Sequence, residues 1–108
     1  MTGSRRSRRV VVRVRRSFGV EIEIDGTSRT TDSVDVGLGG VCVRTDADDG
    51  LAVDTAVSLT LRIPSSEPVR ATGRVCWRDD GEGEAGIQFD VVAPDDLLRL
   101  AQWLRSEI

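Results

Sequence analysis

Apolar residues recur at every second position in several short stretches of this 108-residue chain. The clearest stretches are 56–63 and 69–78, and residues 20–24 alternate valine or isoleucine with glutamate. Because successive side chains of a strand point to opposite faces, this period of two predicts strands that each bury one face. The pattern therefore constrains the chain to a sheet whose inner face is apolar and whose outer face is polar.

Short turn segments separate the stretches that alternate. We expect strands at 20–24, 27–36, 41–45, 56–63, 69–78 and 85–89. Turns are expected at Asp25-Gly26, 37–40, 46–50, 64–68 and 79–84, which are rich in glycine, proline, aspartate or serine. Six short strands joined in this way predict an all-β fold, a small six-stranded antiparallel β-barrel.

The last segment has a helical pattern. Pro94 suits the first turn of a helix, and Asp95 and Asp96 suit the positive end of the helix dipole. Apolar residues then recur at helical spacing and should pack on the sheet: Leu97, Leu100, Ala101 and Leu104. Trp103 lies beside that stripe, so the C-terminal α-helix is expected to cap the barrel with Trp103 over one end.

The charges divide the chain into two parts. The first sixteen residues contain seven arginines and no acidic residue, so their formal charge is +7. The other ninety-two contain eight arginines and all eighteen acidic residues, so theirs is −10. We expect a single domain with a flexible Arg-rich N-terminal arm over residues 1–19 and the barrel with its helix over residues 20–108. An anion that the two parts hold together would explain the division.

The composition argues against several classes of function. The chain has no histidine and no lysine, so it lacks the commonest general base, the commonest metal ligand and a Schiff-base residue. Cys42 and Cys76 lie in apolar runs, which favours reduced core thiols over a disulfide or a zinc site. No serine lies in a GxSxG motif, and we expect neither an enzyme nor a cofactor. No apolar run has the ~20 residues of a membrane span, and we expect a cytoplasmic protein.

The arm contains arginines spaced four residues apart. Arg9 and Arg13 would share one face whether the arm is extended, at ~13 Å, or helical. Arg5 and Arg9 have the same spacing, so the residues alone leave the register open. A cluster of arginines by itself is most often a solvated tail or a nonspecific patch for polyanions, and this alternative stays open here.

A carboxylate stands before a glycine turn in Asp35-Val-Gly-Leu-Gly-Gly40. Asp35 could accept hydrogen bonds from the N–H edge of a guanine. Gly37 and Gly40 could let the backbone approach a ligand closely, although a plain turn between strands explains the glycines equally well. The acidic residues of 46–54 and 79–84 lack the order of a calcium loop and are interpreted as solvated turns.

Taken together, these motifs resemble the PilZ domain, a bacterial module for cyclic di-GMP. The family pattern has RxxxR in an N-terminal arm and (D/N)xSxxG at the end of a strand about twenty residues later. The matching segments here are Arg9-xxx-Arg13, Asp35-Val-Gly-Leu-Gly-Gly40, Gly73-Arg-Val-Cys-Trp77, Gly86-Ile-Gln-Phe89 and Pro94-Asp-Asp-Leu-Leu. The resemblance covers residues 8–108 and favours Arg9 with Arg13 over Arg5 with Arg9.

The resemblance implies a PilZ-type barrel that binds cyclic di-GMP without catalysis and signals when its arm becomes ordered. Ligand-binding residues are then Arg8, Arg9 and Arg13 on phosphate and guanine, Asp35 on a guanine edge, and Gly37 and Gly40 beside the ligand. A downstream protein would receive the signal.

One departure from the family pattern opens alternatives to this function. The family serine is Gly37 here, which removes one hydroxyl ligand worth about 0.5–1.5 kcal/mol. A PilZ module that does not bind the nucleotide and instead binds a protein is therefore the second hypothesis. A nonspecific nucleic-acid binder is the third, which the negative body opposes.

Overall fold

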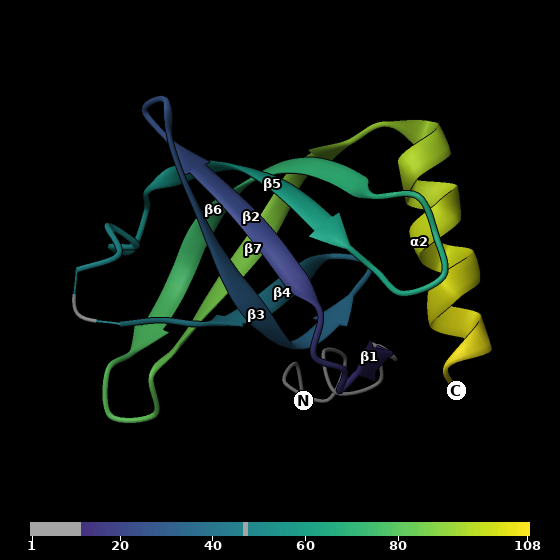
Figure 1. The fold of residues 1–108 in the computed structure, drawn as a ribbon, viewed down its shortest axis with the longest axis horizontal. Coiled ribbons are helices and arrows are strands. Elements are labelled where there is room, and N and C mark those ends of the chain that lie inside the picture. The colour runs from purple at the N-terminus through teal and green to yellow at the C-terminus, as the bar shows by residue number, and fades with distance from the viewer. Residues whose placement is uncertain (1–11, 47) are drawn as a thin grey trace, which may run out of the picture.

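Seven strands and one helix make up the part of the chain that the computed structural model describes, residues 12–46 and 48–108 (Figure 1). The strands are β1 Arg13–Val14, β2 Gly19–Ile24, β3 Thr27–Gly37, β4 Gly40–Arg44, β5 Ala56–Arg62, β6 Val69–Asp79 and β7 Glu84–Val92. The helix is α2, Pro94–Ser106. Each of the six predicted strands and the predicted helix is present, and the short strand β1 is additional.

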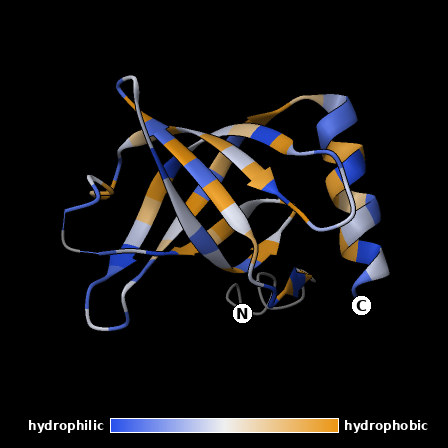
Figure 2. Cartoon of the chain, in the orientation of Figure 1, coloured by the Kyte–Doolittle hydropathy of each residue, from blue (hydrophilic) through white to orange (hydrophobic). Residues whose placement is uncertain are grey.

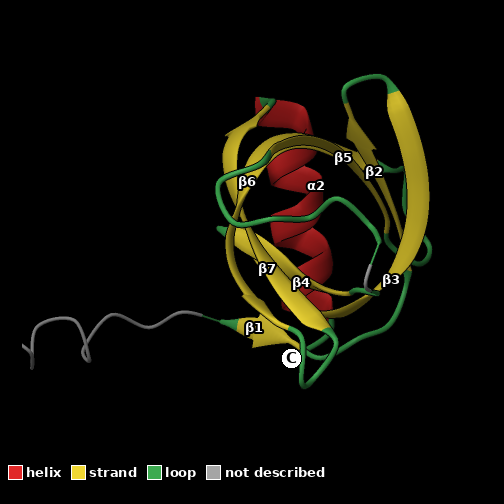
Figure 3. Cartoon of the chain, turned by 90° about the vertical axis from the view of Figure 1, so that its left-hand side faces the viewer, coloured by secondary structure: helices red, strands yellow, loops and turns green. Residues whose placement is uncertain are grey.

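The strands β2 to β7 close into an antiparallel barrel. The order along the sheet is β1-β3-β2-β5-β6-β7-β4, and a further pairing of β3 with β4 closes the ring, with β1 outside it on the edge of β3. The turn between β2 and β3 is tight because Asp25 and Gly26 both have positive φ, which suits a two-residue hairpin. In Figure 3 the strands form a ring with α2 on its far side. The predicted six-stranded barrel with a C-terminal helix is confirmed.

The apolar positions of the alternating stretches fill the barrel. Figure 2 shows apolar and polar positions alternating along the strands. In β5, Val57, Leu59 and Leu61 are buried while Ser58 and Arg62 are exposed. Burial of such side chains contributes about 1.5–3 kcal/mol each relative to exposure. The hydrophobic effect acting on a period-two pattern therefore favours a sheet whose apolar face is turned inward.

Helix α2 caps one end of the barrel, opposite the 45–55 loop (Figure 1). Leu100, Trp103 and Leu104 are buried, whereas Leu97 is 39% exposed. The predicted apolar stripe is thus correct in its C-terminal part and wrong at Leu97. Trp103 is more central to the contact than its position beside the stripe indicated.

A bulge in β6 changes which side chains face outward. The register between β6 and β7 shifts between Val75 and Trp77, so that Cys76 is the extra residue. A bulge interrupts the alternation of faces. As a result Trp77 is 43% exposed although the pattern placed it with Val75 on the inner face. Cys76 is also exposed, so its assignment as a core thiol is wrong, whereas Cys42 is buried as expected.

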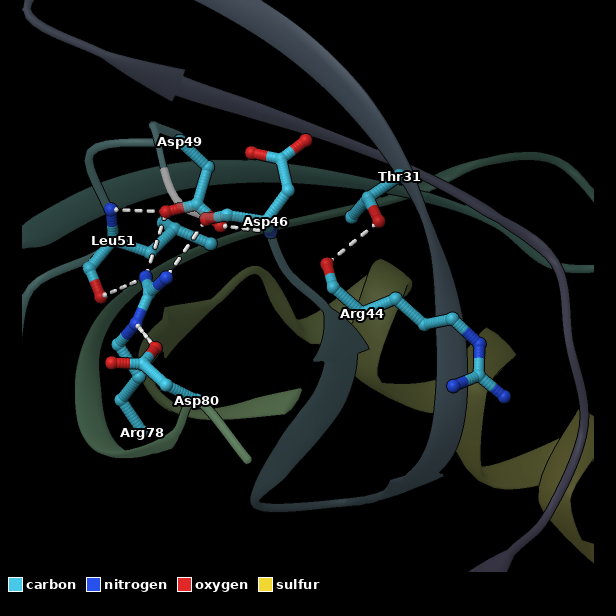
Figure 4. A network of polar contacts seen from close by, with 7 residues as sticks. All are labelled: Thr31, Arg44, Asp46, Asp49, Leu51, Arg78 and Asp80. Carbon is cyan, nitrogen blue, oxygen red and sulfur yellow. Dashed lines mark hydrogen bonds and ion pairs between the residues drawn. The ribbon is translucent and has the colours of Figure 1, made fainter. Parts of the chain in front are cut away.

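The acidic loop after β4 is more structured than a solvated turn (Figure 4). Asp49 is 5% exposed and accepts hydrogen bonds from the backbone N–H groups of Asp46 and Leu51, each at 3.0 Å. Arg78 of β6 pairs with Asp49 at 2.7 Å and with Asp80 at 2.5 Å. The interpretation of Asp49 as solvated is therefore wrong, because the guanidinium and two amides replace its hydration.

The strand β1 lies within the predicted arm. Arg13 pairs with Gly37 and Val14 with Val36 of β3, and the Val14 side chain is 8% exposed. Phe18 continues the same edge, because its carbonyl accepts a hydrogen bond from the Ser33 N–H at 2.9 Å. Residues 13–18 thus run along β3 in line with β2.

Candidate functional site

An ion pair joins the arm to the barrel where β3 ends. Arg13 Nη2 lies 2.5 Å from Asp35 Oδ1, and Arg13 Nε donates to the same oxygen at 2.7 Å. The β1–β3 pairing brings the two residues together, since Arg13 stands opposite Gly37, two residues beyond Asp35. Both side chains are partly open to solvent, at 39% and 22% exposure. The structure therefore brings together two of the predicted site residues.

The two predicted site glycines are required by packing. A Cβ at Gly37 would lie 2.9 Å from the Val12 carbonyl oxygen, and one at Gly40 would collide with the Ile87 backbone. Gly40 pairs with Gln88 of β7, so its lack of a side chain lets β4 and β7 approach. Gly37 lies directly beneath the arm and beside Arg13.

A pocket of about 380 Å³ opens on the outer face of the barrel beside the ion pair. It is lined by Arg13, Asp35, Gly39, Gly40, Val41, Cys42, Cys76, Trp77, Gly86, Ile87 and Gln88. These residues come from β1, β3, β4, β6 and β7 and from the turn between β3 and β4. A cation, a carboxylate and an aromatic ring thus share one concave surface, which is typical of a site for a polar ligand with a planar ring.

The aromatic side chain of this pocket was missed by the sequence reasoning. Trp77 pairs with Gly86, and a Cβ at Gly86 would collide with the Trp77 indole ring. The indole therefore lies over Gly86 while 43% of the residue remains exposed. The alternation over 69–78 predicts Trp77 on the inner face with Val75, and the bulge between these two residues is the reason the ring faces the pocket.

Both cysteines line this pocket but differ in character. Burial, with a smaller contribution from the Asp35 and Glu84 carboxylates, raises the pKa of the Cys42 thiol to about 11. The Cys42 thiol lies 3.7 Å from Glu84 Oε1, and the Cys76 thiol lies 3.3 Å from the Gly86 carbonyl oxygen. Only Cys76 is exposed.

Alkylation should distinguish the two thiols. At pH 8, about one Cys42 side chain in a thousand is a thiolate, because its pKa lies about three units higher. We expect iodoacetamide to modify Cys76 at least ~10 times faster than Cys42, as peptide mass spectrometry would measure. Equal rates in the folded protein would contradict the burial of Cys42. Urea should equalise the rates by removing that burial.

The base of the arm, residues 16–18, contacts β3 and α2. The Ser33 hydroxyl accepts from the Phe18 N–H at 2.9 Å and donates to the Arg16 carbonyl oxygen at 2.5 Å. Phe18 packs edge-on against Trp103 with ring centroids 5.6 Å apart. Arg16 also pairs with Glu107, just beyond α2, at 2.5 Å. The segment that follows Arg13 thus contacts both the barrel and the helix.

Two predicted site residues cannot be placed. Arg8 and Arg9 lie outside the described residues, so the structure leaves their roles as predictions. Within residues 12–46 and 48–108, no group of three or more histidine, cysteine or acidic residues could hold a metal ion. No helix in that part of the chain is long and apolar enough to cross a membrane.

Several solved structures have the same fold. The chain is similar to Bacillus subtilis MotI/DgrA, described as an inhibitor of motility, with a TM-score of 0.78 and 18% identity. It is also similar to K. pneumonia MrkH in complex with c-di-GMP, with a TM-score of 0.74 and 18% identity. Each comparison covers 91% of this chain and 50% of the other, so the chain spans about half their length.

A third structure matches over nearly its whole length. The PilZ domain of CeSA from a cellulose-synthesizing bacterium has a TM-score of 0.67 and 14% identity, over 87% of this chain and 95% of that one. No curated protein sequence matches the chain. No enzymatic family is among these matches. The family model of the PilZ domain matches residues 4–106, and the chain therefore belongs to the PilZ domain family.

Proposed function

We propose that this domain is a cytoplasmic receptor for cyclic di-GMP without catalytic activity. The observation that carries the proposal is the meeting of Arg13 and Asp35 beside the Trp77 pocket. The ligand is a dianion with two guanines, so it needs a cation for phosphate, an acceptor for the guanine N–H edge and a surface for the base. The three residues supply one of each.

The arginines would hold the phosphates and the guanine O6 and N7 atoms. The guanidinium of Arg13 reaches the pocket, and Arg8 and Arg9 precede it in the arm. Arginine holds phosphate or guanine at two points, and each good contact to guanine contributes about 1–3 kcal/mol. Two or three such contacts, less the cost of ordering the arm, fit micromolar affinity, about −8 kcal/mol.

Asp35 and Trp77 would bind the bases. Both contacts from Arg13 fall on Asp35 Oδ1, so Oδ2 is the oxygen we assign to the guanine N1–H and N2–H groups. The partly exposed indole of Trp77 offers a face for stacking, which contributes about 1–3 kcal/mol per base in other nucleotide-binding proteins.

The arm would carry the signal to a partner protein. In the proposal, ligand brings Arg8 and Arg9 onto the site and orders the residues before Val12. Phe18, which contacts Trp103, and Arg16, which pairs with Glu107, connect this region to α2. An ordered segment beside a helix is a surface that a protein can recognise.

Calorimetric titration with cyclic di-GMP tests the proposal. We expect the wild type to bind at micromolar concentration and the Arg9→Ala/Arg13→Ala variant to bind on the order of 100-fold more weakly, because two contacts of about 1–3 kcal/mol are lost. The Arg29→Ala/Arg70→Ala variant removes the same charge from residues that do not line the pocket, and it should bind as the wild type does. Equal binding by all three proteins would overturn the arginine clamp.

A second function is favoured by the surface beside the arm. Val12, Leu38, Ala101, Leu104, Arg105 and Ile108 line an apolar groove of about 480 Å³ between the arm, the β3–β4 turn and α2. The family serine is absent at position 37, which favours a domain that binds a protein in place of the nucleotide. Such a domain would use this groove as its contact surface. A null titration with cyclic di-GMP would favour this alternative.

The third hypothesis, a nonspecific nucleic-acid binder, has a different signature. Binding that falls steeply with salt and does not distinguish cyclic di-GMP from DNA would favour it.

A further inference from the structure

We infer that Gly37 is a positioning residue, whose missing side chain lets the arm pair with β3 and so places Arg13 at the site. The effect on ligand binding rests on the proposed function, but the effect on the arm does not. Glycine at this position would then be the reason that Arg13 lies beside Asp35.

The space above Gly37 is occupied by the arm itself. A Cβ on Gly37 would lie 2.9 Å from the carbonyl oxygen of Val12, closer than a Cβ approaches backbone oxygen in real structures. It would also lie 3.4 Å from both Cγ and Nη1 of Arg13. The Val12 oxygen is backbone and cannot rotate away, so any side chain at position 37 must move the arm or strand β3.

Backbone conformation does not explain the glycine. Gly37 ends strand β3, and its φ is not positive, unlike that of Gly26 or Gly83. An alanine or serine could adopt the same dihedral angles. The requirement for glycine at position 37 therefore comes from the close approach of the arm.

The contact is coupled to the ion pair. Arg13 stands opposite Gly37 in the register, and its side chain passes over Gly37 to reach Asp35. Pushing the Val12 carbonyl outward would weaken the two-residue pairing of β1 and displace the Arg13 guanidinium from the pocket. Among the residues that the structure describes, β1 is an edge strand of two residues that pairs with β3 alone, so no second strand compensates for the loss.

The inference reverses the expectation drawn from the family serine. A hydroxyl at position 37 would offer ligand one hydrogen bond. Its Cβ would also weaken the docking of the arm on β3. Ligand binding would then have to order Arg13 as well, which lowers the affinity. We expect Gly37→Ser to weaken binding of cyclic di-GMP and Gly37→Ala, which adds the Cβ without the hydroxyl, to weaken it more.

Gly19→Ala is the matched control. Gly19 also lies in a strand and has a φ that is not positive, it does not line the pocket, and nothing lies within 4 Å of a Cβ built there. In hydrogen–deuterium exchange without ligand, Gly37→Ala and Gly37→Ser should speed exchange of the backbone amides of residues 13–15 by about tenfold, corresponding to a loss of about 1.4 kcal/mol in local stability. Gly19→Ala should leave their exchange at the wild-type rate.

The calorimetric part of the test uses the same three variants. The affinity for cyclic di-GMP should fall about tenfold in Gly37→Ala and less in Gly37→Ser, and it should not change in Gly19→Ala. Unchanged exchange at residues 13–15 in Gly37→Ala would overturn the inference, as would tighter binding by Gly37→Ser. If exchange rises as expected while the wild type fails to bind the nucleotide, the proposed function fails and the positioning role of Gly37 stands.

Discussion

Asp49→Ala is expected to destabilise the fold by about 3 kcal/mol in urea or thermal unfolding. The carboxylate is 5% exposed, and its loss leaves the N–H groups of Asp46 and Leu51 and one contact of Arg78 without an acceptor. Breaking a buried ion pair by removing one partner typically costs about 3–5 kcal/mol, and Arg78 keeps its contact to Asp80 here. Asp48→Ala removes an exposed carboxylate from the same loop and should change stability by less than about 0.5 kcal/mol.

The stability of the wild type should also fall in acid. Burial would raise the pKa of Asp49, but hydrogen bonds from Arg78 and from the Leu51 and Asp46 amides lower it below its ordinary value of 3.8. A lowered pKa in the folded state contributes stability that is present above the unfolded pKa and lost as pH falls through the folded pKa. Asp49→Asn should therefore show a shallower loss of stability below about pH 4. Parallel pH profiles for the two proteins would contradict the lowered pKa.

Trp103→Ala is expected to cost about 3–5 kcal/mol of unfolding free energy, the usual range for a buried tryptophan. Trp103 is 7% exposed and packs against Phe18, so the substitution leaves a cavity between α2 and the base of the arm. Thermal unfolding followed by circular dichroism would measure the change.

Trp77→Ala is the matched control, since the same substitution is made at a residue that is 43% exposed. It should change stability far less than Trp103→Ala and should weaken binding of cyclic di-GMP, by about 1–3 kcal/mol for the lost stacking. A larger loss of stability for Trp77→Ala than for Trp103→Ala would mean that the indole over Gly86 supports the barrel and not the ligand.

Much of the fold could be predicted because apolar residues alternate without interruption along most strands and recur at helical spacing along most of the helix. The stretch 56–63 needed nothing beyond alternation, and it is β5. Prediction failed where local geometry breaks a period. Beyond the bulge at Cys76, side chains of β6 that the alternation places inside point outward. No residue type near Cys76 indicates a bulge. Leu97 has the correct helical spacing but lies in the first turn of α2, where its side chain is 39% exposed.

Less of the candidate site could be predicted, because its residues meet through strand register. Arg13 and Asp35 were each identified from their motifs, and their ion pair depends on the pairing of β1 with β3. The buried role of Asp49 depends on Arg78, twenty-nine residues away, which was assigned no role from the sequence. The signal that could have found Trp77 was its place next to Gly86 on the neighbouring strand, a small residue that leaves room for a ring.

The contact of Arg16 with Glu107 brings the two flanks of the domain together at one pole of the barrel. In a longer protein, a neighbouring domain attached after Ile108 would begin just beyond Glu107 and therefore beside the base of the arm. A displacement of the arm at Arg16 would then reach that neighbour through Glu107, without a change in the strands of the barrel. A contact of this kind would let a β-barrel pass on a signal while its own strands keep their arrangement.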